Sequence, residues 1–185
     1  MTVRWPVVII GAAATLLLSV GSLVLIGISS GGIGSPAGGS VVNCAPPSLT
    51  GQVVHLTAMN MGRGNVNGMM GGAGAMSLRA DRSTVSSGKV SFLVTNVGTV
   101  SHELIVLPLT GSALAGSRAI GGDSRVDEST SLGEASASCA EGSGEGILPG
   151  ASGWVTLTLA PGRYELLCNL PGHYAAGMYT QLTVR

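Results

Sequence analysis

Six stretches of the chain alternate hydrophobic and polar residues with a period of two, and turn-forming residues bound them. This pattern predicts β-strands, because successive side chains of a strand point to opposite faces of a sheet. Val, Leu and Thr, which favour strands, are frequent in all six. The predicted strands are residues 52–58, 89–96, 102–109, 154–160, 164–169 and 178–184.

After residue 50, no stretch has the period of a long amphipathic helix. Short strands separated by turn signals, without alternating helices, predict an all-β sandwich or barrel over residues 51–185. Two insertions interrupt the pattern. Residues 59–76 hold five Met and six Gly, and residues 110–152 are mostly small and polar, with a short helix as an option near residues 112–118.

The N-terminal segment predicts export. Residues 7–28 contain no charged residue, and Arg4 precedes them. The run is long enough for a membrane span of roughly 20 residues and exceeds the roughly 7–15 residues of a signal-peptide core. Arg4 is expected to stay cytoplasmic, which sends the remainder outward. We interpret residues 1–28 as a membrane anchor, with a cleaved signal as the alternative, and the Gly-, Ser- and Pro-rich residues 29–50 as a linker.

Composition excludes one class of function and bears on the cysteines. The 185 residues have a formal net charge of zero and only 10% charged residues, so the chain lacks the basic surface that binds nucleic acids. It contains three cysteines. Because an exported chain can form disulfides, we predict a bond between Cys44 and Cys139, with free thiols as the alternative.

The segment CNLPGHYAAGM carries the candidate chemistry. Its Cys168, His173 and Met178 follow one another at intervals of five residues. Strand alternation places Cys168, Met178 and the upstream His102 on the apolar faces of their strands, close to strand ends, and His173 on the loop between. The four side chains are therefore expected to converge at one end of the sandwich.

Two imidazoles and a thiolate, with a weak thioether, are the donors of an electron-transfer copper site. Taken singly, each residue has a commoner role: a buried Cys or Met fills a core, and a histidine lies at a strand edge. The agreement of residue type, spacing, strand parity and export favours the metal site. His55 has no companion at ligand spacing and is predicted to be a surface residue.

The pattern Cys-x4-His-x4-Met, with Ser-His-Glu upstream at residues 101–103, resembles the type 1 blue copper proteins, the cupredoxin family of plastocyanin and azurin. The Pro-Gly-His and Gly-Met pairs are also similar to sulfocyanin-like members. The resemblance covers about residues 51–185 and implies a Greek-key β-sandwich with one copper. The implied ligands are His102, Cys168, His173 and Met178.

The chain is expected to be a one-electron carrier served by redox partner proteins, and the N-terminal segment predicts that it is tethered to the membrane outside the cytoplasm. Copper storage or delivery is the alternative, with the thioethers of residues 59–76 as a Cu(I) loading site; the simpler interpretation of that insertion is a flexible loop. A structural sandwich is a third hypothesis. A copper enzyme is disfavoured, because the chain has only three histidines and no small-molecule substrate is implied.

Overall fold

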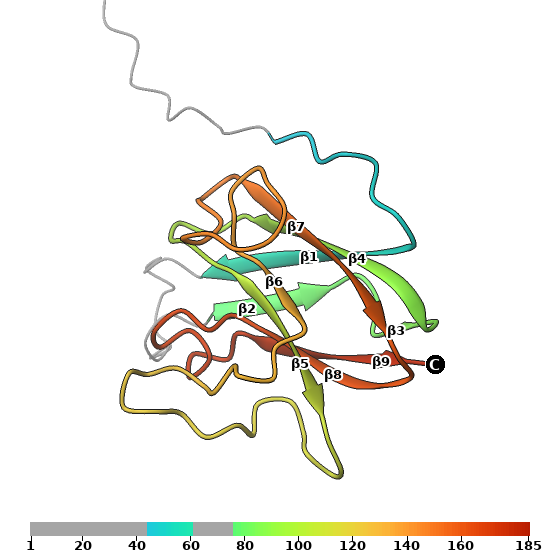
Figure 1. Ribbon diagram of the computed structural model, residues 1–185. Coiled ribbons are helices and arrows are strands. Elements are labelled where there is room, and N and C mark those ends of the chain that lie inside the picture. Colours follow the sequence, from blue (N-terminus) through green and yellow to red (C-terminus); the bar gives the residue numbers. More distant parts are fainter. Residues whose placement is uncertain (1–43, 61–75) are drawn as a thin grey trace, which may run out of the picture. The chain divides into compact units, whose positions relative to one another are not determined.

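A computed structural model of the protein describes residues 44–60 and 76–185 (Figure 1). In these ranges the chain folds into strands arranged in two sheets. The strands are β1 (Gln52–Asn60), β2 (Met76–Ala80), β3 (Thr84–Val85), β4 (Gly88–Asn96), β5 (Leu104–Leu109), β6 (Gly133–Ala135), β7 (Ser152–Leu159), β8 (Gly162–Leu167) and β9 (Tyr179–Val184). The predicted all-β sandwich is confirmed.

One sheet has the strand order β2-β1-β4-β7 and the other β3-β9-β8-β5-β6. Neighbouring strands are antiparallel, except that β1 is parallel to β4 and β3 is parallel to β9. Strand β8 lies between β5 and β9, with Leu166 opposite Val106 on one side and Thr180 on the other. This central position fixes the point at which the chain leaves β8 toward Cys168.

The main core fills the space between the two sheets. It takes alternate residues from each strand, because only one face of a strand points inward. Phe92, the chain's one phenylalanine, is completely buried there. Cys168 and Met178 belong to the same cluster, so the predicted inward parity is confirmed. Further members are Val54, Leu56, Val94, Leu104, Val106, Leu166 and Leu182.

A second, smaller core lies on the other face of β5 and β8. It contains Ile105 and Leu107 of β5, Leu167 of β8, and the loop residues Val126 and Tyr174. Both faces of β5 are therefore buried, which explains why its sequence LIVLPL is almost entirely apolar. The loop after β5 covers a sheet face that would otherwise be exposed.

The structure corrects several predicted boundaries. Strand β5 begins at Leu104 and not at residue 102, because His102 forms only an isolated bridge with Ile147. Strand β8 runs from Gly162 to Leu167, two residues earlier than predicted, and β9 begins at Tyr179, one residue later than predicted. Residues 112–118 form turns and bends, and the optional helix is absent from them.

Strands β2, β3 and β6 were not predicted. Residues 59 and 60 complete β1 and Met76 begins β2, so the ends of the predicted Met/Gly insertion are strand residues. Its residues 61–75 lie outside the described residues, as do the predicted anchor and residues 29–43 of the predicted linker. Within residues 44–60 and 76–185, no helix has the length and hydropathy of a membrane span.

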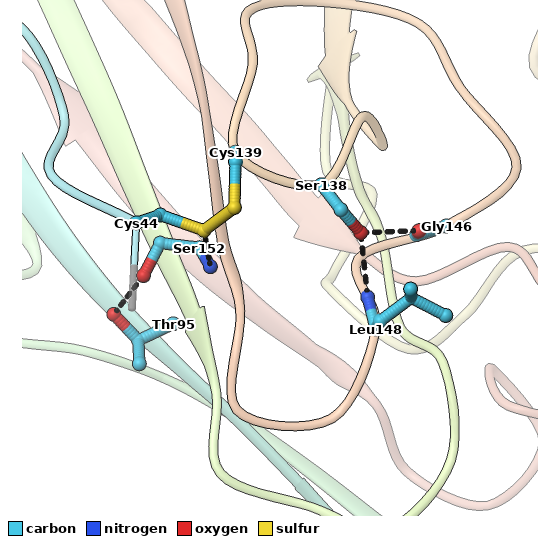
Figure 2. The surroundings of a disulfide bond; sticks show 7 residues. All are labelled: Cys44, Thr95, Ser138, Cys139, Gly146, Leu148 and Ser152. Carbon is cyan, nitrogen blue, oxygen red and sulfur yellow. Dashed lines mark hydrogen bonds between the residues drawn. A yellow bond between two sulfur atoms is a disulfide. The ribbon is translucent and has the colours of Figure 1, made fainter. Parts of the chain in front are cut away.

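A disulfide joins Cys44 to Cys139, as predicted, and links positions 95 residues apart (Figure 2). The Ser152 N–H donates to Cys44 Sγ at 3.5 Å, and the Ser152 hydroxyl lies 3.0 Å from that of Thr95 on β4. The Ser138 hydroxyl accepts the N–H of Leu148 and so closes the loop that contains Cys139. The bond thus attaches the segment before β1 to the loop between β6 and β7.

Candidate metal centre

Three of the four predicted ligands form a compact cluster. The Nδ1 atom of His173 lies 3.3 Å from Nδ1 of His102 and 3.3 Å from Sγ of Cys168. The three donor atoms all lie within 4.8 Å of one another. They come from positions just before β5, just after β8 and within the loop between β8 and β9. One ion can therefore contact all three donors.

Backbone hydrogen bonds fix the cluster at the end of the sandwich. His102 exchanges two bonds with Ile147, at 3.1 and 2.7 Å, so its backbone is tied to the segment before β7. The Cys168 N–H donates to the Met178 carbonyl at 3.0 Å, and the Met178 N–H donates to the His173 carbonyl at 3.2 Å. These two bonds close residues 168–178 into a ligand loop, with the completely buried Met178 at its base.

Burial sets the protonation of the donors. His102 and Cys168 are completely buried, whereas His173 is partly exposed. Burial, with the neighbouring His173, lowers the pKa of His102 to about 4, and burial lowers the pKa of His173. Both imidazoles are therefore neutral at pH 7 and offer lone pairs. Burial also raises the pKa of Cys168 to about 12, so a metal that binds its thiolate displaces a proton.

Asn60, the last residue of β1, orients His102. Its Oδ1 lies 3.3 Å from His102 Nε2 and accepts the Thr99 N–H at 2.7 Å. An Nε2–H that donates to this oxygen leaves Nδ1 as the metal-binding nitrogen. A Cβ atom on Gly98 would collide with this oxygen and lie 2.9 Å from His102 Nε2. The close approach therefore requires glycine at position 98.

Glu103 and Asn169 support the thiol of Cys168. The Glu103 N–H points at Cys168 Sγ from 3.4 Å, and its carboxylate accepts the Asn169 N–H at 3.0 Å. Burial raises the pKa of Glu103 to about 7, although the bond from Asn169 opposes this rise. The residues that follow His102 and Cys168 are thus bonded to each other, which holds the two donors side by side.

The structure brings His102, Cys168 and His173 together and places Met178 at the base of their loop. His55 is exposed on β1 and lies outside the cluster, as predicted. Sequence reasoning missed Asn60, Glu103 and Asn169. The signal for Glu103 and Asn169 was adjacency to a ligand; Asn60 is 42 positions from His102, and no sequence pattern links the two.

Comparison with known proteins gives a family. The model of the copper-binding proteins of the plastocyanin/azurin family matches residues 66–185, which include His102, Cys168, His173 and Met178. Among solved structures, rusticyanin from Thiobacillus ferrooxidans is 17% identical, with a TM-score of 0.43 over 74% of this chain and 79% of that chain. Auracyanin from Roseiflexus castenholzii is 26% identical, with a TM-score of 0.40 over 57% and 86%. No curated protein sequence matches the chain.

The donor set fits the metal of this family. A buried thiol, two neutral imidazoles and a buried thioether residue supply the soft and intermediate donors that copper prefers. The arrangement of His102, Cys168, His173 and Met178 is consistent with a single type 1 copper site. The chain belongs to the plastocyanin/azurin family of copper-binding proteins, the type 1 blue copper cupredoxins.

Proposed function

We propose that the protein is a one-electron carrier that works outside the cytoplasm. The observation that carries this proposal is the contrast in exposure within the metal centre: His102, Cys168 and Met178 are completely buried, whereas His173 reaches the surface. A centre of this kind exchanges electrons through one ligand edge and keeps water from the others. Copper, when bound, supplies the Cu(I)/Cu(II) couple.

The chain's contribution is to hold the donors in one arrangement. Backbone bonds fix Cys168 against Met178, Asn60 fixes the ring of His102, and Glu103 directs its N–H at the thiol. Donors that keep their positions in both oxidation states reduce the rearrangement that accompanies electron transfer. This rigidity supports a carrier.

The surface around His173 suits transient docking. Pro171 and Ala175 are exposed beside the partly exposed ring, so the loop presents small apolar groups to a redox partner. Interfaces of small area are typical of weak electron-transfer encounters. We therefore propose a partner protein, and not a small molecule, as the electron donor or acceptor.

A carrier also agrees with the closed donor set. Copper enzymes that act on a substrate keep an open coordination position, whereas four protein donors leave none. Two cavities of about 390 and 340 Å³ are lined by residues 108–130, and none of the four site residues lines either one. Family members are generally electron carriers, in keeping with this assignment.

The location rests on the disulfide and on the N-terminal segment. A bond between Cys44 and Cys139 is typical of proteins outside the cytoplasm. Attachment to the membrane through residues 7–28 remains our prediction from their apolar composition. Fractionation of cells that express the full chain tests it: we expect the protein in the membrane fraction, and a soluble chain starting near residue 30 would show a cleaved signal.

Electron self-exchange tests the carrier proposal. NMR line widths in mixtures of the reduced and oxidised copper-loaded protein measure its rate. We expect fast exchange that slows when a bulky side chain replaces Ala175 beside His173. Slow exchange in the wild type, together with ready transfer of Cu(I) to a chelator, would instead support copper delivery.

A further inference from the structure

The segment between β5 and β6 lies against the ligand loop. Residues 110–132 consist of turns and irregular chain apart from a bridge between Ile120 and Val126. Connections longer than about 12–15 residues without secondary structure are uncommon in compact domains and are usually functional when ordered. Here three parts of the segment contact the stretch from Cys168 to Tyr174.

The first contact centres on Glu165, whose side chain is completely buried on β8. Its carboxylate accepts Nε–H of Arg118 at 2.6 Å, the N–H of Gly116 at 2.7 Å and the hydroxyl of Tyr174 at 2.9 Å. Arg118 also donates to the Pro108 carbonyl at 2.8 Å. A buried carboxylate is tolerated only with such complete pairing, so these partners hold each other in place.

Tyr174 transmits this network to the metal centre, because it follows His173 directly. Its hydroxyl also accepts the Arg118 N–H at 3.1 Å, and its ring packs in the smaller core beside Val126 and Leu167. The residue is therefore fixed at both its ring and its hydroxyl. Because adjacent residues share a peptide plane, a fixed Tyr174 restricts where the His173 ring can lie.

The second and third contacts hold the other part of the loop. The Asn169 side chain accepts the Val126 N–H at 2.8 Å and donates to the Val126 carbonyl at 3.0 Å and to Glu128 at 2.8 Å. The Gly172 N–H donates to the Ser124 carbonyl at 3.0 Å. Asn169 follows Cys168, and Tyr174 follows His173. The segment therefore forms hydrogen bonds with the residue after each of these two ligands.

Gly116 shows how closely the segment approaches. It adopts a φ of +86°, which favours glycine, and a Cβ atom there would collide with the ring of Tyr179. Tyr179 in turn packs on Tyr174, with ring centroids 5.1 Å apart. Glycine thus permits the backbone to reach Glu165 beside the two tyrosines.

We propose that residues 116–128 form a clamp that holds the ligand loop in its metal-binding position, with Tyr174 and Asn169 as its positioning residues. This inference rests on the copper site of the proposed function. It gives a role to part of the predicted insertion of residues 110–152, which interrupts the strand pattern. The clamp's expected effect is slow release of copper and a fixed ligand geometry, because residues around ligands commonly change metal affinity about 10–100-fold.

A pair of Tyr→Phe variants tests the clamp in the full chain. Tyr174→Phe removes the hydroxyl that joins Arg118 and Glu165 and keeps the ring. Tyr164→Phe is the matched control: its buried side chain donates to the Ala160 carbonyl at 2.7 Å, at the far end of β8 from Cys168. Each variant loses one hydroxyl group. Tyr174→Phe gives up the bonds to Glu165 and Arg118, and Tyr164→Phe gives up the bond to Ala160, so only the first touches the clamp.

The measurements are copper release to an excess of a Cu(I) chelator and the visible spectrum of the oxidised protein. We expect Tyr174→Phe to release copper about tenfold faster, at the lower end of the effects that residues supporting a ligand have on metal affinity. We also expect its thiolate absorption band to shift. Tyr164→Phe is expected to match the wild type in both. Equal release rates and equal spectra in the two variants would overturn the clamp.

An arginine pair provides a second test. Arg163 donates to the carbonyls of Gly111 and Ala113, so it holds the same segment without contacting the ligand loop. Arg118→Met should speed copper release at least as much as Tyr174→Phe, Arg118→Lys should restore part of the loss, and Arg163→Met should have little effect. Equal release from the Arg118→Met and Arg163→Met proteins would contradict the clamp. If Arg118→Met fails to fold, the tyrosine pair decides the matter.

The outcomes separate this inference from the proposed function. Slow electron exchange in a wild type that binds copper contradicts the carrier alone, since release rates do not depend on electron transfer. A wild type that binds no copper contradicts both. Fast exchange with equal release from the two tyrosine variants contradicts only the clamp.

Discussion

The chain's three cysteines lie in two regions with opposite chemistry. Cys44 and Cys139 form a disulfide near the surface, whereas Cys168 is free and completely buried, with two imidazoles within 4.8 Å of its sulfur. The two regions share one compartment in our proposal, so compartment alone does not decide the state of a thiol. The neighbouring side chains decide it. A thiol with a second sulfur within bonding distance forms a disulfide, whereas a thiol beside neutral imidazoles can bind a metal with them.

The two regions also act on the fold in different ways. The disulfide connects positions 95 residues apart and stabilises mainly by restricting the unfolded chain. The metal centre instead depends on the position of each donor in the folded state. Breaking the disulfide should therefore affect stability and leave the copper site intact, while a change in the centre should do the reverse.

The largest expected effect is that of Cys168→Ser. The serine hydroxyl cannot replace a thiolate donor, so the intense visible absorption of the copper-loaded protein should vanish and copper affinity should fall sharply. Absorption spectroscopy after copper addition measures this. The double variant Cys44→Ser/Cys139→Ser is the control and should stay coloured. A strongly coloured Cys168→Ser protein would contradict the assignment of the thiolate.

Next come the two histidines, which share a residue type but differ in exposure. His173→Gly opens a position at the surface, so added imidazole should enter it and restore the colour. His102→Gly leaves a buried gap and removes the hydrogen bond to Asn60, so imidazole should restore it far less. Titration with imidazole, followed by absorption, compares them. Equal rescue of both would show that exposure does not distinguish the two ligands.

The disulfide variant has a smaller effect, confined to stability. Cys44→Ser/Cys139→Ser should lower the free energy of unfolding by about 2–5 kcal/mol, since the bond closes a long loop. Urea unfolding of the copper-free protein measures this change. The spectrum and potential of the copper-loaded variant should equal those of the wild type. A changed spectrum would show that the two regions are coupled and that the contrast between them is too simple.

Much of the fold could be predicted from the sequence because strand alternation is a local signal. The six longer strands, β1, β4, β5, β7, β8 and β9, were all found within two residues at each end. Strands β2, β3 and β6 were missed: β3 and β6 have two and three residues, too few to show a period, and β2 begins at Met76, the last residue of the Met/Gly insertion. Pairing with neighbours, and not local pattern, makes these segments strands.

The metal centre likewise has a part that the sequence predicted and a part that it did not. Cys168, His173 and Met178 share one loop, so their spacing was visible, and strand parity added His102. The supporting contacts were not visible, because Arg118 and Glu165 are 47 positions apart and Asn60 and His102 are 42 apart. Such pairs meet only in the folded chain: Asn60 and His102 when the two sheets stack, and Arg118 and Glu165 when the loop after β5 covers β8. Residue spacing predicted the donors, and the three-dimensional fold revealed what holds them.

The smallest expected effect is that of substitutions at Met178. Its backbone carbonyl accepts the Cys168 N–H, and its thioether is a weaker donor than the Cys168 thiolate. As a weak axial donor it tunes the reduction potential and contributes little to the colour. Met178→Gln introduces an oxygen donor that favours Cu(II), so the potential should fall. Met178→Leu leaves an apolar wall that disfavours the doubly charged ion, so the potential should rise. Each tenfold change in the relative affinity for the two oxidation states corresponds to about 59 mV. Cyclic voltammetry measures the shifts, with Cys44→Ser/Cys139→Ser as a control that should keep the wild-type potential. Two unchanged potentials would remove Met178 from the ligand set and leave His102, Cys168 and His173 as the site.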